Sequence, residues 1–127
     1  MAADLKFAKT HEWIRPEDGG LATVGISAYA VEALTDLVFM QLPEVGRQVK
    51  AGESIGEIES VKAVSDFYAP VSGEIVAVNT AVPNALETLG QDPYGAGWLV
   101  KIRPDNPSEL SALLDQAAYE SLAKAGH

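Results

Sequence analysis

Short runs in which apolar and polar residues alternate make up most of the chain, and turn-forming residues separate them. Residues 12–26 form two such runs around the turn Pro16-Glu17-Asp18-Gly19-Gly20, which predicts a β-hairpin. Ser27 precedes a short helical pattern that reaches Leu34, and serine is a favoured residue for capping a helix. The remaining predicted strands are the runs at 5–8, 35–42, 55–59, 64–68, 74–78 and 98–102, and a short extended piece begins at Val49. Many short strands joined by turns indicate an all-β sandwich or barrel.

Two apolar segments carry specific predictions. Residues 35–42 are the most apolar run, so we expect this strand to pass through the core. Residues 108–124 have the periodicity of a C-terminal helix, which either packs on the sheet or serves a partner. The stripe of this helix consists of Leu110, Leu113, Leu114, Ala117 and Ala118. We therefore expect one domain over residues 1–127, with its core at about 5–103 and a short helix in the N-terminal half.

One lysine lies between two strand-like runs. The segment Glu57-Ile58-Glu59-Ser60-Val61-Lys62-Ala63-Val64-Ser65-Asp66 alternates on both sides of residues 60–63, which predicts a tight hairpin with Lys62 at its tip. The small apolar neighbours Val61 and Ala63 leave the ammonium group unobstructed. The spacing alone leaves open an ordinary surface lysine or a functional, modified one.

Composition narrows the classes of function. The chain has 127 residues, of which 47% are hydrophobic, enough for a single core. It carries 18 acidic and 9 basic side chains, a formal charge of −9 that repels nucleic acid and suits partners with basic surfaces. No apolar run has membrane-spanning length, and the N-terminus does not resemble a signal peptide. We expect a location in a bacterial-type cytoplasm, or in the mitochondrial matrix if the chain is a processed one.

The side chains offer little catalytic chemistry. There is no cysteine, and the two histidines, His11 and His127, have no metal-ligand spacing. A serine nucleophile would have only His11 as its base. The carboxylates Glu57, Glu59 and Asp66 around the hairpin either support acid–base chemistry or simply form a solvated, charged face. We expect a protein that is not an enzyme and has no metal site.

Several longer motifs occur in a fixed order on both sides of Lys62. They are His11-Glu12-Trp13, Val24-Gly25-Ile26-Ser27, Val38-Phe39, Leu42-Pro43-Glu44-Val45-Gly46, Glu59-Ser60-Val61-Lys62-Ala63, Pro70-Val71-Ser72-Gly73-Glu74 and Asp92-Pro93-Tyr94-Gly95 followed by Gly97-Trp98. In these motifs the chain, from about Leu5 to Arg103, resembles the H-protein family of the glycine cleavage system, whose members carry a lipoyl group. Thr35, Leu86 and Gly90 depart from the usual family pattern, and all three lie outside the lysine hairpin.

The resemblance implies a barrel-sandwich hybrid of two small antiparallel sheets, with lipoate joined to the Lys62 side chain as an amide. It implies a carrier that takes an aminomethyl group from the glycine decarboxylase (P protein) and presents it to the aminomethyltransferase (T protein). The dihydrolipoamide dehydrogenase (L protein) then reoxidises the arm. The resemblance also makes Thr10, Glu12 and Asp66 candidates for docking the loaded arm, against the alternatives of a turn hydroxyl for Thr10 and a surface carboxylate for Glu12.

Position relative to Lys62 makes Glu59, together with Val61 and Ala63, a candidate for recognition by lipoylating enzymes. Trp13 and Trp98 are better interpreted as packing residues, because large aromatic side chains mostly anchor cores. Two other functions stay open at this point. One is a relay that donates lipoate or octanoate to other lipoyl domains, and the other is a β-sandwich interaction module with an unmodified Lys62.

Overall fold

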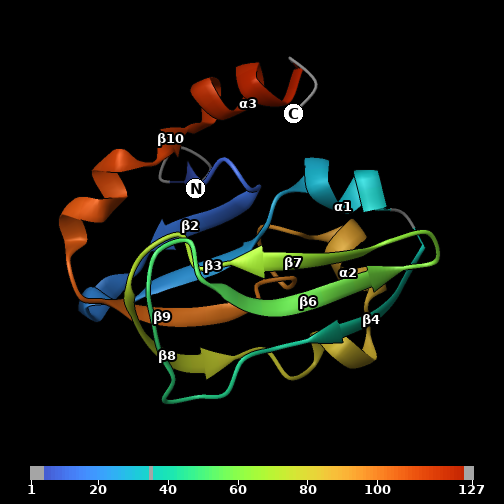
Figure 1. The fold of residues 1–127 in the computed structure, drawn as a ribbon, viewed down its shortest axis with the longest axis horizontal. Helices are drawn as coiled ribbons and strands as arrows, with labels where there is room; N and C mark the ends of the chain where they lie inside the picture. The colour runs from blue at the N-terminus through green and yellow to red at the C-terminus, as the bar shows by residue number, and fades with distance from the viewer. Residues whose placement is uncertain (1–4, 35, 125–127) are drawn as a thin grey trace.

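The computed structural model describes residues 5–34 and 36–124, which form two antiparallel sheets with short helices around them (Figure 1). The larger sheet has the strand order β10 (Leu114–Asp115), β1 (Lys6–Phe7), β2 (Glu12–Pro16), β3 (Ala22–Ile26), β9 (Val100–Pro104), β8 (Gly73–Val78) and β5 (Gln48–Val49). The smaller sheet has the order β4 (Leu37–Gln41), β6 (Ser54–Ser60) and β7 (Val64–Tyr68). The prediction of an all-β fold built from two antiparallel sheets is confirmed, although seven strands make the larger sheet broader than expected.

The predicted hairpin over residues 12–26 is present as β2 and β3. Its register pairs Glu12 with Ile26 at the open end. The chain turns through the 3-10 helix η2 (Asp18–Gly20), where Gly19 and Gly20 have φ angles of 80° and 79°. Glycine adopts this left-handed conformation without steric cost, which explains the pair of glycines at the turn.

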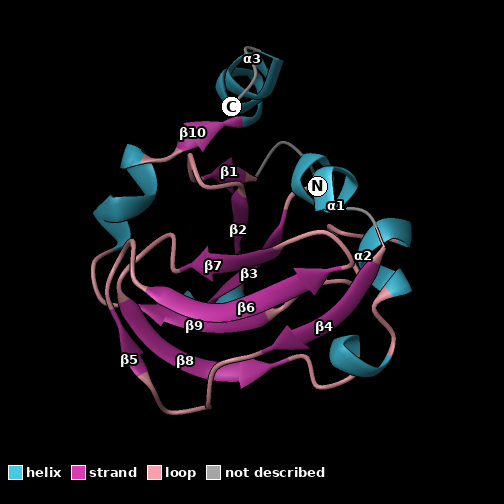
Figure 2. Cartoon of the chain, turned by 45° about the vertical axis from the view of Figure 1, so that its right-hand side comes forward, coloured by secondary structure: helices cyan, strands magenta, loops and turns pink. Residues whose placement is uncertain are grey.

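The helix of the N-terminal half, α1 (Ala28–Leu34), follows β3 as predicted. The Ser27 hydroxyl accepts a hydrogen bond from the Ala30 amide at 3.2 Å, which satisfies one free donor of the first turn. Val31 is the buried residue of this helix. Two shorter helical turns follow later in the chain, η3 (Val82–Asn84) and α2 (Glu87–Gln91). The helix α2 lies next to α1 (Figure 2), and η3 lies against β4.

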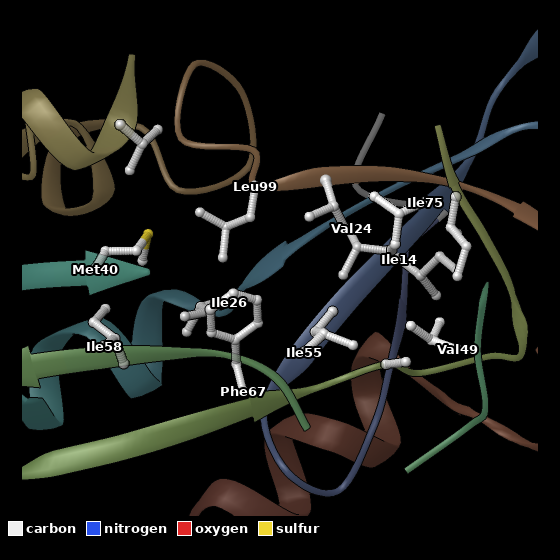
Figure 3. Close-up of a cluster of buried hydrophobic side chains, with 14 of the residues drawn as sticks. Ile14, Val24, Ile26, Met40, Val49, Ile55, Ile58, Phe67, Ile75 and Leu99 are labelled. Carbon is white, nitrogen blue, oxygen red and sulfur yellow. The ribbon is translucent and has the colours of Figure 1, made fainter. Parts of the chain in front are cut away.

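The main core lies between the two sheets. Figure 3 shows Ile58 and Phe67 of the smaller sheet in one cluster with Val24 and Ile75 of the larger sheet. All four side chains are at most 1% exposed. Burial of each such side chain contributes about 1.5–3 kcal/mol relative to exposure, so this cluster holds the sheets together.

The prediction that residues 35–42 run through the core is wrong. Within the described residues this segment forms β4, which lies at the edge of the smaller sheet and buries only Met40. Val38 and Phe39 are 56% and 46% exposed. A β-bulge between Leu37 and Phe39 turns Val38 outward, and an edge strand has just one face on the core, so a continuous apolar run did not imply burial on both faces. Thr35 lies outside the described residues.

The prediction of one continuous helix over 108–124 is also wrong. The segment divides into a 3-10 helix, η4 (Pro107–Ala112), strand β10, and the helix α3 (Gln116–Lys124). Leu114 is extended because it pairs with Phe7 of β1, and the Asp115 side chain accepts the Ala118 amide at 2.8 Å and starts α3 anew. Pairing with a distant strand is a tertiary interaction that overrides local helical periodicity.

Tyr119 fixes α3 to the larger sheet. Its ring stacks on Phe7 with centroids 4.3 Å apart, and both side chains join Trp13 in a second buried cluster. Ala117 and Ala118, which belonged to the predicted stripe, are exposed. The helix therefore packs on the sheet through one aromatic residue. Trp13 is fully buried, and Trp98 packs partly buried against the same cluster, in agreement with their interpretation as packing residues.

Candidate functional site

The loop that joins β6 and β7 holds Lys62 at the tip of a hairpin, as predicted. The Ser60 amide donates to the Ala63 carbonyl at 2.8 Å, and the Ala63 amide donates to the Ser60 hydroxyl at 3.1 Å. The Ser60 side chain thus replaces a backbone acceptor in the turn. The Val61 amide donates to the Asp36 carbonyl at 3.1 Å, which ties the tip to the start of β4.

Lys62 is exposed, as are Val61 and Ala63 on either side of it. Across residues 5–34 and 36–124 the ion pairs are Arg15–Glu17, Arg47–Glu53 and Arg103–Glu74, and none involves Lys62. The loop projects from one end of the molecule, beyond the strands that carry it (Figure 1). The Lys62 amine is therefore accessible to another protein. The backbone of the loop is held by hydrogen bonds among Asp36, Ser60, Val61 and Ala63.

The three candidate docking residues line one pocket. Thr10, Glu12 and Asp66 face a cavity of about 270 Å³ whose other walls come from α1, β3 and the smaller sheet. Its apolar lining consists of Ile26, Tyr29, Ala30, Ala33, Leu34, Ile58 and Phe67. A larger and more open hollow of about 870 Å³ runs along β4 and β6 and also reaches Asp66, but it contains neither Thr10 nor Glu12.

Glu12 is the buried acid of this pocket, with 1% of its surface exposed. The interpretation of Glu12 as a surface carboxylate is therefore wrong. Burial raises the pKa of Glu12 from 4.5 to about 7, while hydrogen bonds from the Thr10 hydroxyl and the Tyr68 amide oppose the rise. Near neutral pH this carboxyl is balanced between its neutral and ionised forms.

Next to the pocket lies a hydrogen-bonded cluster of Tyr119, His11 and Ser27, which the sequence did not reveal. The Tyr119 hydroxyl lies 2.6 Å from the His11 Nδ1 atom and 2.6 Å from the Ser27 hydroxyl. His11 has a φ of 80°, rare outside glycine, and it stands between Thr10 and Glu12. No local pattern could identify Tyr119, because 108 residues separate it from His11.

The candidates for recognition lie on the hairpin and its outer face. Val61 and Ala63 flank Lys62 in the turn, and Glu59 pairs in register with Phe39 of β4 and Val64 of β7. Within residues 5–34 and 36–124, no group of three or more His, Asp or Glu side chains is arranged to hold a metal ion. None of the helices in those residues is long and apolar enough to cross a membrane.

Two packed antiparallel sheets with an exposed lysine on a hydrogen-bonded hairpin are the arrangement expected for the barrel-sandwich class of domains. The profile of the family described as Glycine cleavage H-protein matches residues 5–126. The chain is 52% identical over 126 residues to the glycine cleavage system H protein of Symbiobacterium thermophilum, covering 99% of this chain and 98% of that one. It is 55% identical over 121 residues to the protein of the same name from Idiomarina loihiensis, covering 95% and 94% of the two chains.

A solved structure agrees with this assignment. The crystal structure of a glycine cleavage system H protein from Mycobacterium marinum superposes with a TM-score of 0.87 at 48% identity, covering 96% of this chain and 98% of that one. The chain belongs to the glycine cleavage H-protein family. Proteins of this family are the lipoyl carriers of the glycine cleavage system and are not themselves catalytic, which confirms the predicted function, fold and carrier character.

Proposed function

We propose that lipoate is joined to Lys62 and that the arm so formed carries the aminomethyl group of glycine cleavage. The observation that supports this most strongly is the exposed Lys62 side chain on a turn whose backbone is fixed by Ser60 and Asp36. A rigid root with a mobile side chain is what a swinging arm requires, because the arm then searches a small volume at high effective concentration.

The residues around Lys62 fit the attachment of this group. Val61 and Ala63 are exposed and uncharged, so they leave room for an enzyme to approach the amine. Formation of the amide removes the charge of Lys62. When attached, the lipoyl group supplies a disulfide that is reduced as it receives the aminomethyl group on one sulfur.

The pocket beside the hairpin suits a loaded arm. Its apolar walls would exclude water from the cargo, and Glu12 would ionise as a cationic amine arrives, since a nearby positive charge lowers the pKa of a carboxyl. Thr10 holds one oxygen of that carboxyl, and Asp66 offers a second negative charge at the rim. We assign arm docking to these three residues.

Membership of the glycine cleavage system implies partner proteins. We assign three of them as the glycine decarboxylase (P protein), the aminomethyltransferase (T protein) and the dihydrolipoamide dehydrogenase (L protein), with a lipoylating enzyme upstream. Residues 1–127 would act as one carrier domain. The relatives named above come from bacteria, which supports a cytoplasmic location.

Intact-mass spectrometry of protein from its native host tests the attachment. We expect a lipoyl-sized increment that disappears in Lys62→Ala and persists in Lys50→Ala, a matched exposed lysine at another turn. Lys62→Ala should also fold normally and give no glycine-dependent NADH formation with the three partner enzymes. Full NADH formation by Lys62→Ala, or unmodified native protein, would refute the proposal and leave the plain interaction module.

Docking is tested by the lifetime of the loaded arm. In Glu12→Gln the charge partner of the amine is lost, and a charge-assisted hydrogen bond contributes about 1.5–3 kcal/mol, so we expect the aminomethyl group to be lost about tenfold faster or more. Time-resolved mass spectrometry of the loaded protein at pH 8 measures this loss. An unchanged lifetime in Glu12→Gln would show that the pocket does not hold the cargo through this carboxylate.

A further inference from the structure

Large apolar side chains are concentrated on the surface beside Lys62. Six of them are exposed among the described residues, and four lie on the hairpin or on β4 next to it. We name these four the hairpin patch: Val38, Phe39, Val61 and Val64. Val61 and Val64 are the most exposed of the six, at 75% and 62%. Isolated surface apolar residues are common, but a contiguous group marks an interaction site.

Strand register makes the patch contiguous. Phe39 of β4, Glu59 of β6 and Val64 of β7 are direct neighbours across the smaller sheet. They point outward, because side chains alternate along a strand and the next residues, such as Ile58 and Met40, are buried. The bulge turns Val38 outward beside this row, and the contact between Val61 and the Asp36 carbonyl brings the hairpin tip to the start of β4.

Acidic residues border the patch. Glu59 lies within the row, and the next outward row pairs Glu57 with Asp66. A complementary surface would combine apolar side chains with lysine or arginine, in keeping with the formal charge of −9 on the whole chain.

The position of Lys62 identifies which partner needs this surface. An enzyme that acylates the unmodified lysine must bring its catalytic centre to the Nζ atom itself. Such an enzyme therefore contacts the protein surface around the hairpin. Enzymes that meet the finished arm reach it at a distance and are free to dock elsewhere. We propose that the hairpin patch is the docking surface of the enzyme that acylates Lys62, an inference that rests on the proposed lipoylation.

The step proposed at this surface is an acyl transfer to Lys62 from an activated lipoate, which in the test below is the lipoyl adenylate that a ligase forms from lipoate and ATP. A base of the enzyme takes a proton from the Lys62 ammonium, and the free amine attacks the acyl carbon. The amide C–N bond forms, the C–O bond to the phosphate breaks, AMP leaves, and the amine loses a second proton. The patch would hold the lysine in place for this attack without contacting the reacting atoms.

Steady-state acylation by a purified ATP-dependent lipoate ligase, with lipoate and ATP, tests the proposal. Intact mass gives the rate at several carrier concentrations. We expect Val64→Ser and Phe39→Ser to raise KM for the carrier about fivefold to tenfold each, with little change in kcat. Val45→Ser is the matched control, because Val45 is 59% exposed and lies in the turn after β4, outside the patch. Thermal unfolding of each variant establishes that its fold is intact.

A second measurement separates this surface from the later reactions. Each variant is driven to complete lipoylation with excess ligase and then assayed in glycine-dependent NADH formation, where we expect parent-like rates. KM values of Val64→Ser and Phe39→Ser equal to that of Val45→Ser would overturn the proposal. So would equal or greater losses in the NADH assay, which would assign the patch to a downstream enzyme. Absence of acylation in the parent protein would instead refute the proposed lipoylation itself.

Discussion

Glu12 combines two requirements that oppose each other at one residue. The side chain is buried, which favours the neutral carboxyl and raises its pKa to about 7. The Tyr68 amide donates to one of its oxygens at 2.9 Å, and the Thr10 hydroxyl donates to the other, which favours the carboxylate. A pKa of about 7 means that near neutral pH the carboxyl exists in both its neutral and its ionised form, and a cation entering the pocket would favour the ionised form.

The raised pKa of Glu12 predicts a pH-dependent loss of stability. The folded state binds this proton more tightly than the unfolded state, so the contribution is complete below pH 4.5 and is lost as the pH rises through 7. Between pH 5 and pH 8 we expect the parent to lose about 2–3 kcal/mol of unfolding free energy relative to Glu12→Gln, because glutamine does not titrate. Urea denaturation at both pH values measures the shift.

Glu44→Gln is the control for this measurement, because Glu44 is an exposed glutamate outside the pocket. Its difference from the parent should stay nearly constant over the same interval. A Glu12→Gln difference that is equally constant would mean that the buried carboxyl titrates near its ordinary pKa.

Residue roles near Lys62 were predictable where they depend on local sequence. The interruption of alternation at residues 60–63 places the lysine at a tip without any knowledge of the fold. The burial of Glu12 was not predictable, because a glutamate on a strand next to a turn is usually solvated. It is buried here because α1 and β7, which are distant in sequence, close over it.

Among the elements, those decided by short-range chemistry were predicted correctly. The hairpin of β2 and β3 follows from its glycine turn, and α1 follows from the Ser27 cap. The errors concern β4 and the C-terminal segment, where tertiary position decides the outcome. An apolar run does not reveal that β4 is an edge strand, and helical periodicity does not reveal that Leu114 pairs with β1.

The helix α3 reaches the pocket through Tyr119. Its hydroxyl binds His11 and Ser27, so it links the C-terminal helix to the turn before β2 and to the start of α1. His11 in turn accepts the Ser27 amide through its carbonyl at 2.9 Å. We therefore expect Tyr119 to position Thr10 and Glu12, which adjoin His11.

We expect Tyr119→Phe to loosen this link while keeping the ring stack on Phe7. Loss of buried hydrogen bonds costs about 1–3 kcal/mol, and the pocket should respond more strongly than the fold. The loaded arm should be lost several-fold faster, and the NMR titration of the Glu12 carboxyl should shift. Tyr68→Phe is the control for the removal of a tyrosine hydroxyl, because it keeps the Tyr68 amide that donates to Glu12. A loss of stability in Tyr119→Phe with the Glu12 titration unchanged would reduce Tyr119 to a packing residue.

At the scale of the whole molecule, the two packed sheets hold the hairpin that carries Lys62 in a fixed position. The smaller sheet carries the hairpin and is held to the larger sheet by a buried apolar core, so the tip projects from a fixed base (Figures 1 and 3). Ile58 and Phe67 of β6 and β7 line the pocket, the hairpin patch lies on the outward side of the same strands, and Asp66 adjoins both. Under the proposed function, the same two strands would present Lys62 for attachment of the arm and would line the pocket that holds its cargo.

The formal charge of −9 should attract a basic partner. We expect the acidic side chains near Lys62 to contribute more to this attraction than acidic side chains elsewhere. Steering by charge changes association rates by about 10-fold to 1000-fold and weakens with salt. Two variants remove three negative charges each. One carries Glu57→Gln, Glu59→Gln and Asp66→Asn beside Lys62, and the other carries Glu74→Gln, Asp105→Asn and Glu120→Gln away from the hairpin.

Both variants have the same net charge, so a comparison between them isolates position. We expect the hairpin variant to bind the lipoate ligase at least about fivefold more slowly at low salt, and the distant variant to bind within about twofold of the parent. Stopped-flow association at about 20 mM and 300 mM salt measures both rates. The difference between the association rates of the two variants should nearly disappear at the higher salt. There the Debye length is less than about 10 Å, so more distant charges are screened. Equal slowing of the two variants would mean that net charge alone guides the encounter and that the acids around Lys62 have no special part in it.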